Sequence, residues 1–165
     1  MIEHASPDDS NLAPFRLTRG RLLLAGSLAG LAALIASVLP LEALATPSEV
    51  QKWLAAQYPG TPKAGKVTIG APDIAENGNT VPITISVESP MTTNDFVKGI
   101  VVAADGNPLP GVARFDLSPL NGQANVQFRI RLAQTQTITA VALMNDGSLW
   151  SASKVVKVTI GGCGG

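Results

Sequence analysis

The chain ends in Gly161-Gly162-Cys163-Gly164-Gly165, and Cys163 is its single cysteine. Glycines have no side chains to pack and lose much conformational entropy when they are ordered, so we expect residues 161–165 to form a flexible arm. A lone cysteine is more often a small buried hydrophobe, but glycines on both sides favour an accessible thiol. The end of the chain is therefore predicted to present a reactive sulfur atom.

This thiol could act as a nucleophile or as a covalent attachment point. A cysteine sulfur can be joined to another sulfur, extended, oxidised and released by thiol exchange, while its bond to carbon stays intact. Residues 161–163, fully extended, span on the order of 10 Å at about 3.3–3.6 Å per residue, which is enough to carry a group into the cleft of an enzyme. Prenylation is disfavoured, because too few residues follow Cys163 for that signal.

The composition excludes most self-contained catalysis. The only histidine, His4, lies in an N-terminal segment that we expect to be removed. A chain with one Cys and no His cannot assemble a Ser-His-Asp or Cys-His site, or a His/Cys metal cage, from its own residues. We therefore expect no enzymatic activity, no metal and no cofactor. The 12 basic side chains balance 12 acidic ones and are scattered singly, so nucleic-acid binding is not expected either.

The N-terminus has the features of an export signal. Three arginines precede an uncharged run over 22–39, and small residues typical of a cleavage site end at Ala45. We predict that residues 1–45 are cleaved and leave no membrane anchor. The alternative is an uncleaved anchor, because the run reaches the lower edge of a spanning length. The export route stays undecided, since a glycine separates Arg19 from Arg21 where a twin-arginine signal has adjacent arginines.

Residues 46–160 are predicted to form the one domain that positions the tail, beginning with a short amphipathic helix. Thr46 suits the N-cap, Pro47 suits the first helical position, and Glu49 completes a capping box. Apolar residues then recur at helical spacing until Pro59, where the helix should have ended.

Beyond the helix, apolar and polar residues alternate with a period of two, which is typical of half-buried strands. Turn signals such as Asn-Gly and Asp-Gly separate the strands. The predicted strands cover residues 66–70, 81–88, 97–104, 112–117, 126–132, 137–145 and 149–160. About seven short strands at this spacing predict an all-β fold, an immunoglobulin-like antiparallel β-sandwich.

Two of the predicted strands, 97–104 and 137–145, are apolar on both faces. A strand that is buried only by its own sandwich normally alternates, so something else should cover the second face. One interpretation is that the N-terminal helix covers it. The other is a partner chain, because a small domain that exposes such a patch tends to pair. The partner interface is then predicted at Val97, Ile100, Val102, Val141 and Leu143.

With its tail and two internal motifs, the chain resembles the SoxY family, the sulfur carriers of the bacterial periplasmic thiosulfate-oxidising (Sox) system. The most specific motif is VKVTIGGCGG at 156–165. It is supported by NTVPI at 79–83 in an early strand and by NPLP at 107–110 in a loop. The resemblance covers nearly the whole of residues 46–165.

The resemblance implies a periplasmic carrier that is not an enzyme. Its immunoglobulin-like sandwich would hold thiosulfate-derived intermediates covalently on Cys163, with the surrounding glycines as a swinging arm. It also implies a heterodimer with a SoxZ-like subunit, which is a second β-sandwich protein. That pair would dock in turn with periplasmic enzymes that oxidise the sulfur and release sulfate.

Two other functions are compatible with the residues alone. The first is a structural or interaction module in which Cys163 forms an intermolecular disulfide, since a single cysteine in an oxidising compartment has no partner within its own chain. The second is a sulfur donor that ends in Gly-Gly and carries sulfur as a C-terminal thiocarboxylate. The export signal, the cysteine inside the glycines and the strand pattern all disfavour that donor.

Overall fold

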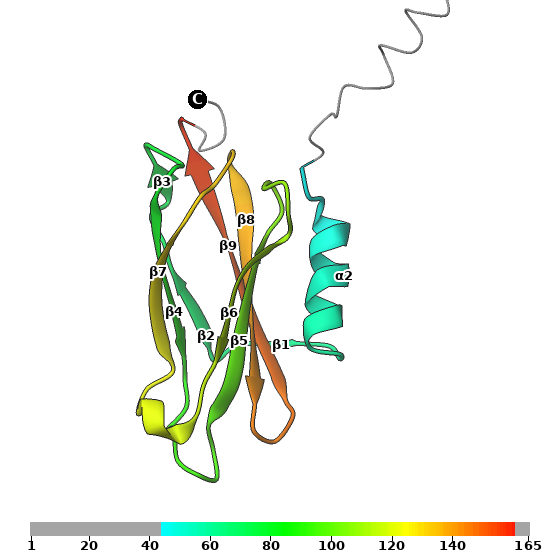
Figure 1. The fold of residues 1–165 in the computed structure, drawn as a ribbon, viewed down its shortest axis with the longest axis vertical. Coiled ribbons are helices and arrows are strands. Elements are labelled where there is room, and N and C mark those ends of the chain that lie inside the picture. The colour runs from blue at the N-terminus through cyan, green and yellow to red at the C-terminus, as the bar shows by residue number, and fades with distance from the viewer. Residues whose placement is uncertain (1–43, 161–165) are drawn as a thin grey trace, which may run out of the picture. The chain divides into compact units, whose positions relative to one another are not determined.

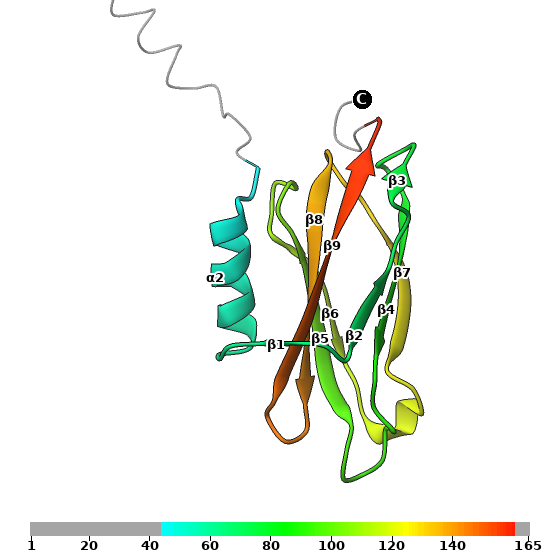
Figure 2. The same cartoon turned by 180° about the vertical axis from the view of Figure 1, so that it is seen from behind.

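The computed structural model describes residues 44–160, which form two facing β-sheets with one α-helix packed on the larger sheet (Figures 1 and 2). The elements are α2 (Pro47–Gln57), β1 (Lys63–Ala64), β2 (Val67–Gly70), β3 (Ile74–Ala75), β4 (Val81–Val87), β5 (Val97–Ala104), β6 (Gly111–Asp116), the 3-10 turn η1 (Pro119–Asn121), β7 (Asn125–Ile130), β8 (Gln136–Met144) and β9 (Leu149–Val158). The predicted immunoglobulin-like sandwich with a short N-terminal helix is confirmed. Most of the predicted signal and the whole predicted arm, residues 161–165, lie outside the described residues.

Helix α2 begins as its capping signal predicts. The Thr46 hydroxyl accepts a hydrogen bond from the backbone N–H of Glu49 at 3.3 Å, and the Glu49 carboxylate accepts one from the backbone N–H of Thr46 at 2.7 Å. The hydrogen bonds from Thr46, first the backbone one and then the hydroxyl one, hold the pKa of the Glu49 carboxyl below its usual value. The helix ends at Gln57, two residues before Pro59.

The larger sheet has the strand order β1-β9-β8-β5-β6, with β3 also paired to β9, and the smaller sheet has the order β2-β4-β7. All seven predicted strands are present, with ends within about two residues of the prediction. The two-residue strands β1 and β3 were not predicted, and both pair with β9 in parallel. Two residues are too few to show an alternation of apolar and polar side chains.

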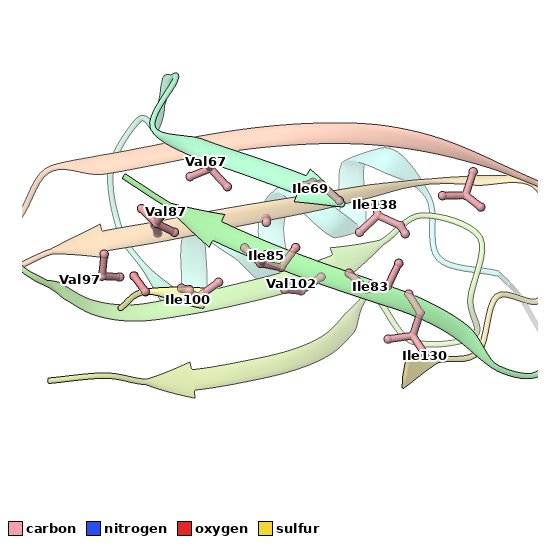
Figure 3. Close-up of a cluster of buried hydrophobic side chains, with 14 of the residues drawn as sticks. Val67, Ile69, Ile83, Ile85, Val87, Val97, Ile100, Val102, Ile130 and Ile138 are labelled. Atoms are coloured by element: carbon pink, nitrogen blue, oxygen red, sulfur yellow. The ribbon is translucent and has the colours of Figure 1, made fainter. Parts of the chain in front are cut away.

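The main core lies between the two sheets (Figure 3). Ile83 and Ile85 of β4 are at most 1% exposed, and they face fully buried residues of the larger sheet, including Ile100, Val102 and Ile138. Each such side chain contributes about 1.5–3 kcal/mol to folding when it is removed from water. This core makes the sandwich a stable platform for the end of β9.

A second core lies between α2 and the outer face of the larger sheet. Val50 and Leu54 of the helix pack with Val101 of β5 and Val141 of β8 in one buried cluster. Alternate residues of β5 therefore point to the small sheet and to the helix, which explains why this strand is apolar on both faces.

This arrangement corrects the predicted partner interface. Val97, Ile100 and Val102 are 0% exposed in the core between the sheets, Val141 is 2% exposed beneath the helix, and Leu143 is half-buried against the same helix cluster. The prediction that these residues form a surface for a partner is wrong, because the chain itself covers them. The helix accounts for the apolar pattern.

Two glycines form the seat of the helix. A Cβ atom on Gly111 would lie 2.5 Å from the Trp53 ring, and one on Gly99 would overlap the Tyr58 hydroxyl. Only glycine at these positions lets the two aromatic side chains approach the sheet so closely. The Tyr58 hydroxyl is buried without a hydrogen-bond partner, and burial raises its pKa.

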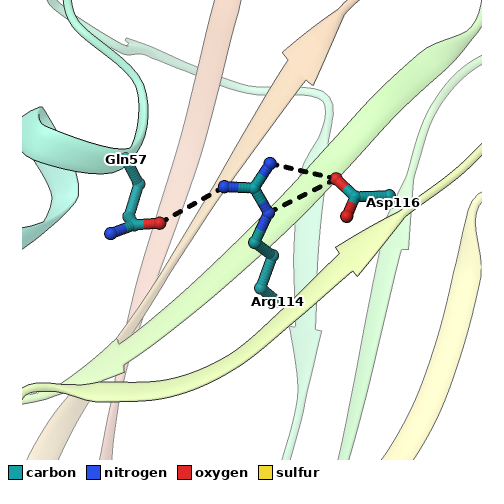
Figure 4. Close-up of polar contacts among 3 residues, drawn as sticks. All are labelled: Gln57, Arg114 and Asp116. Carbon is teal, nitrogen blue, oxygen red and sulfur yellow. Dashed lines mark hydrogen bonds and ion pairs between the residues drawn. The ribbon is translucent and has the colours of Figure 1, made fainter.

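A polar contact fixes the C-terminal end of α2 to β6 (Figure 4). Arg114 donates to the Gln57 side-chain oxygen at 3.3 Å and to Asp116 at 3.2 Å, and its guanidinium lies 5.7 Å from the centre of the Tyr58 ring. Arg114 and Asp116 are both largely exposed, so this ion pair contributes little to stability.

Candidate functional site

The candidate site is the end of β9, where the chain leaves the domain toward Cys163. Three backbone hydrogen bonds fix these last residues: Lys157 N–H to Asp73 at 3.0 Å, Thr159 N–H to Ala75 at 3.1 Å, and Gly78 N–H to the Ile160 carbonyl at 2.8 Å. Ile160 is therefore held up to its own carbonyl group, directly before Gly161. We call residues 157–160 the tail root.

Strand β3 forms one side of the tail root. It runs parallel to β9, with Ile74 beside Lys157 and Ala75 beside Val158, and Ala75 is buried in the main core. Figures 1 and 2 both show β3 alongside the end of β9. The Thr159 hydroxyl adds a hydrogen bond to the Glu76 carbonyl at 2.9 Å. A short unpredicted strand thus anchors the segment from which the tail leaves.

The connection between β7 and β8 holds the other side of the tail root. The Val158 N–H donates to the Thr135 hydroxyl at 2.9 Å, and the Leu132 N–H donates to the Gly78 carbonyl at 2.8 Å. Because Gly78 itself binds Ile160, both sides of the root belong to one hydrogen-bonded unit.

The NPLP motif stabilises this unit through its first residue. The Asn107 side-chain oxygen accepts from Ala133 N–H and from the Gln136 amide, both at 3.0 Å, and its amide donates to the Arg131 carbonyl at 2.9 Å. Gln136 is 4% exposed, and its oxygen accepts from Gly106 N–H at 2.8 Å. Asn107 thereby ties the β5–β6 loop to the connection that supports the tail root.

The NTVPI motif has a related structural role. Asn79 N–H donates to the Asn77 side chain at 2.8 Å within the loop that contacts Ile160. Val81 and Ile83, later in the motif, are each 1% exposed in the main core. The motif therefore links the loop at the tail root to the centre of the sandwich.

The surface around the tail root is partly apolar. Ile160 is 66% exposed and Ile74 is 57% exposed. Lys157 and Glu76 are exposed beside them, while Lys154 pairs with Asp73 at 3.0 Å. Within residues 44–160, no group of three His, Cys, Asp or Glu side chains is placed to hold a metal ion.

The predicted site residues fall into two groups. Cys163 and the four glycines of the predicted arm lie outside the described residues, whereas the five predicted interface residues lie in or against the two cores. Sequence reasoning missed β3 and the bonding role of Asn107. The NPLP motif is the only signal for Asn107 in the sequence, and it indicates a loop without indicating the hydrogen bonds of its side chain.

The predicted cleavage point meets the edge of the described chain. Ala45 is 5% exposed, and its N–H donates to the Asn107 carbonyl at 2.8 Å. No helix within residues 44–160 is long and apolar enough to cross a membrane. The uncharged run over 22–39 lies outside the described residues.

Comparison with known proteins connects this arrangement to sulfur oxidation. Residues 52–163 match the family model described as sulfur oxidation protein SoxY. The solved sulfur carrier protein SoxY from Chlorobium limicola f thiosulfatophilum is 32% identical, with a TM-score of 0.59, and the match covers 70% of this chain and 100% of that chain. A superoxide reductase (neelaredoxin) from Ignicoccus hospitalis is 20% identical over 70% of this chain and 94% of that chain, with a TM-score of 0.51, which shows a shared fold alone. No curated protein matches the chain in sequence.

Proposed function

This chain belongs to the SoxY family of sulfur carriers, and we propose that it carries thiosulfate-derived intermediates covalently on the Cys163 thiol. The observation that supports this proposal is the tail root. The domain fixes the backbone through Ile160, and the only thiol of the chain follows three residues later. A carrier needs such an arrangement, because its reactive group must leave the domain while its attachment stays fixed.

The proposed chemistry divides between the chain and its partner enzymes. Joining the thiol to thiosulfate through a sulfur–sulfur bond releases one proton and two electrons, so loading needs an oxidoreductase that accepts those electrons. Hydrolytic release of sulfate consumes water and leaves the remaining sulfur on the cysteine. Cys163 keeps its carbon–sulfur bond throughout, and the chain itself acts as a carrier and not as a catalyst.

Thiolate formation on Cys163 is also proposed to depend on the enzymes. The residues on both sides of Cys163 are glycines, so its neighbours in the sequence bring no positive charge that would favour ionisation of the thiol. Lys157 is the nearest cation in the sequence, but it belongs to the fixed tail root. A partner active site that surrounds the tail would supply the positive charge.

We propose that the chain works as a heterodimer with a SoxZ-like β-sandwich subunit. Strands β6 and β7 each end a sheet in the described domain, and edge strands offer unpaired backbone groups. Half-buried Phe115 of β6 and Phe128 of β7 face each other, with ring centres 5.1 Å apart. A hollow of about 450 Å³ beside Leu109 and Phe128 adds apolar surface at this side. These features, and not the buried faces of β5 and β8, support a partner surface.

We further propose that the protein acts in the periplasm after cleavage following Ala45. The mature protein would then begin at Thr46, directly at the cap of α2. N-terminal sequencing of the exported protein tests this. A first residue before Ala45 would move the cleavage site, and an intact N-terminus in the membrane fraction would favour the anchor.

Peptide mapping of the protein loaded with thiosulfate tests the carrier proposal. We expect a reductant-labile sulfur adduct on the Cys163 side chain, and we expect Cys163→Ser to abolish it. Gly164→Ser is the matched control, because it adds a hydroxyl next to a retained thiol. Sulfur on the terminal carboxyl group would identify a thiocarboxylate donor instead. Unchanged sulfur oxidation in Cys163→Ser, with loss of disulfide-linked dimers, would identify an interaction module.

A further inference from the structure

We propose that Ile74 and Ile160 form the docking surface that enzymes contact when they act on Cys163. This inference rests on the carrier function proposed above. It assigns a role to two apolar side chains that are mostly exposed. The occupant is the oxidoreductase that loads Cys163, with an apolar rim at the mouth of its active site.

The length of the tail limits where such an enzyme can bind. Cys163 lies three residues beyond Ile160, and three extended residues span on the order of 10 Å. An active site that receives the thiol must therefore bring its mouth to within about that distance of the fixed Ile160 backbone. Contact between the rim of that mouth and the surroundings of the tail root follows from this short reach.

The surroundings of the tail root are suited to docking. Ile160 and Ile74 are 66% and 57% exposed, although their backbones are hydrogen-bonded to neighbouring segments. Apolar side chains on a fixed backbone lose little conformational entropy when a partner covers them. Ile74 lies beside Lys157, and Ile160 is held by Gly78, so the two side chains flank the tail root, with Lys157 and Glu76 as exposed polar neighbours.

The groove between α2 and the larger sheet lies beyond the reach of the tail. A groove of about 280 Å³ lies between α2 and the outer face of β8 and β9, and its end nearest the tail root includes Ser153. Ser153 precedes Ile160 by seven residues, which corresponds to roughly 23 Å along an extended strand. The reach of about 10 Å from Ile160 to the thiol falls short of this groove.

The chain offers a matched control at its other end. Leu120 in η1 is 97% exposed, and Figures 1 and 2 show this turn at the end of the sandwich opposite β3 and the end of β9. Leu120 is as large and as apolar as the two isoleucines, but the tail does not reach it. A substitution there reports any general effect of removing an exposed apolar side chain.

Kinetics of loading test the docking surface. The double variant Ile74→Gln and Ile160→Gln is compared with Leu120→Gln and the wild-type chain, using purified Sox enzymes that load Cys163 with thiosulfate. The initial rate of mass gain on the protein is measured against carrier concentration. We expect the double variant to raise KM about tenfold or more with kcat nearly unchanged, because docking is lost while the chemistry is retained. Leu120→Gln should match the wild type.

Two further readouts make the outcomes distinct. Alkylation of Cys163 by a small reagent should be equal in all three proteins, and the single variant Ile160→Gln should fold normally because its side chain is mostly in solvent. If the double variant loads with a wild-type KM, the docking surface is refuted although the carrier function stands. If the wild-type protein gains no adduct on Cys163, the proposed function fails, and this inference fails with it.

Discussion

Replacement of Gly99 by alanine tests how closely helix α2 approaches the larger sheet. The added Cβ atom would overlap the Tyr58 hydroxyl and would lie 3.2 Å from the Phe115 carbonyl oxygen and 3.4 Å from Tyr58 Cζ. The hydroxyl is thus the main obstacle, and the two other contacts are tight but tolerable. Removal of the hydroxyl in Tyr58→Phe should therefore relieve most of the strain.

The magnitudes follow from the packing. Overpacking a tight core costs about 1–3 kcal/mol, and alanine regains roughly 0.4–1 kcal/mol by restricting the unfolded chain. Gly99→Ala should accordingly destabilise the wild-type protein by about 1–2 kcal/mol. Tyr58→Phe alone should stabilise the protein by about 1 kcal/mol, because it removes a buried hydroxyl without a partner. In the Tyr58→Phe background, Gly99→Ala should cost less than about 0.5 kcal/mol, which gives a coupling energy of about 0.5 kcal/mol or more.

Urea unfolding of the four proteins of this double-mutant cycle measures each free energy of unfolding. An equal cost of Gly99→Ala in both backgrounds would refute the hydroxyl as the obstacle. Destabilisation by Tyr58→Phe would show that the hydroxyl has a hydrogen-bond partner, contrary to the geometry of the seat. Either result would require a different packing of α2 on β5.

Three further predictions concern the tail, the helix cap and the support of the tail root. Replacing Gly161 and Gly162 together by valine should lower turnover by partner enzymes at least tenfold, because misplacing a reacting atom by about 1 Å can cost roughly 100-fold in rate. The free energy of unfolding should change by less than about 0.5 kcal/mol. Turnover at the wild-type rate would contradict the swinging arm. Glu49→Gln should reduce the loss of thermal stability in acid. The pKa of Glu49 is lowered in the folded protein, so its stabilising contribution is present above the unfolded pKa and is lost as pH falls through the folded pKa. An unchanged dependence of Tm on acid pH would contradict this role. Asn107→Ala should destabilise the protein by about 2 kcal/mol or more in urea unfolding, because three hydrogen bonds lose their partner. The control Asn125→Ala removes one exposed hydrogen bond and should change the free energy of unfolding by less than about 0.5 kcal/mol. Similar effects of the two substitutions would contradict the role of Asn107.

Local signals in the sequence predicted the elements that depend on local chemistry. The capping box of Thr46 and Glu49 placed the start of α2, and alternation placed β4 and β7. Strand β3 escaped prediction because Ile74 and Ala75 have no periodicity of their own. They become a strand only when the end of β9 lies beside them, which is a long-range contact.

The chemistry proposed for the site comes from residue types, whereas the hydrogen bonds that support the tail root have no signal in the sequence. Cys163 and its glycines are recognisable from residue types, but nothing in the sequence shows that Asn107 and Thr135 brace the residues before them. The apolar runs of β5 and β8 showed that both faces are covered without showing by what. The helix covers the outer face because Gly99 and Gly111 have no side chains, which lets Tyr58 and Trp53 pack closely against the sheet.

Intact-mass measurement of the protein isolated from cells that are oxidising thiosulfate tests the carrier function most directly. We predict a heterogeneous set of added sulfur-containing masses that a reductant removes, all mapping to Cys163, the only thiol of the chain. The Cys163→Ser protein from the same cells should have a single unmodified mass. A single unmodified mass for the wild-type protein under these conditions would contradict the account.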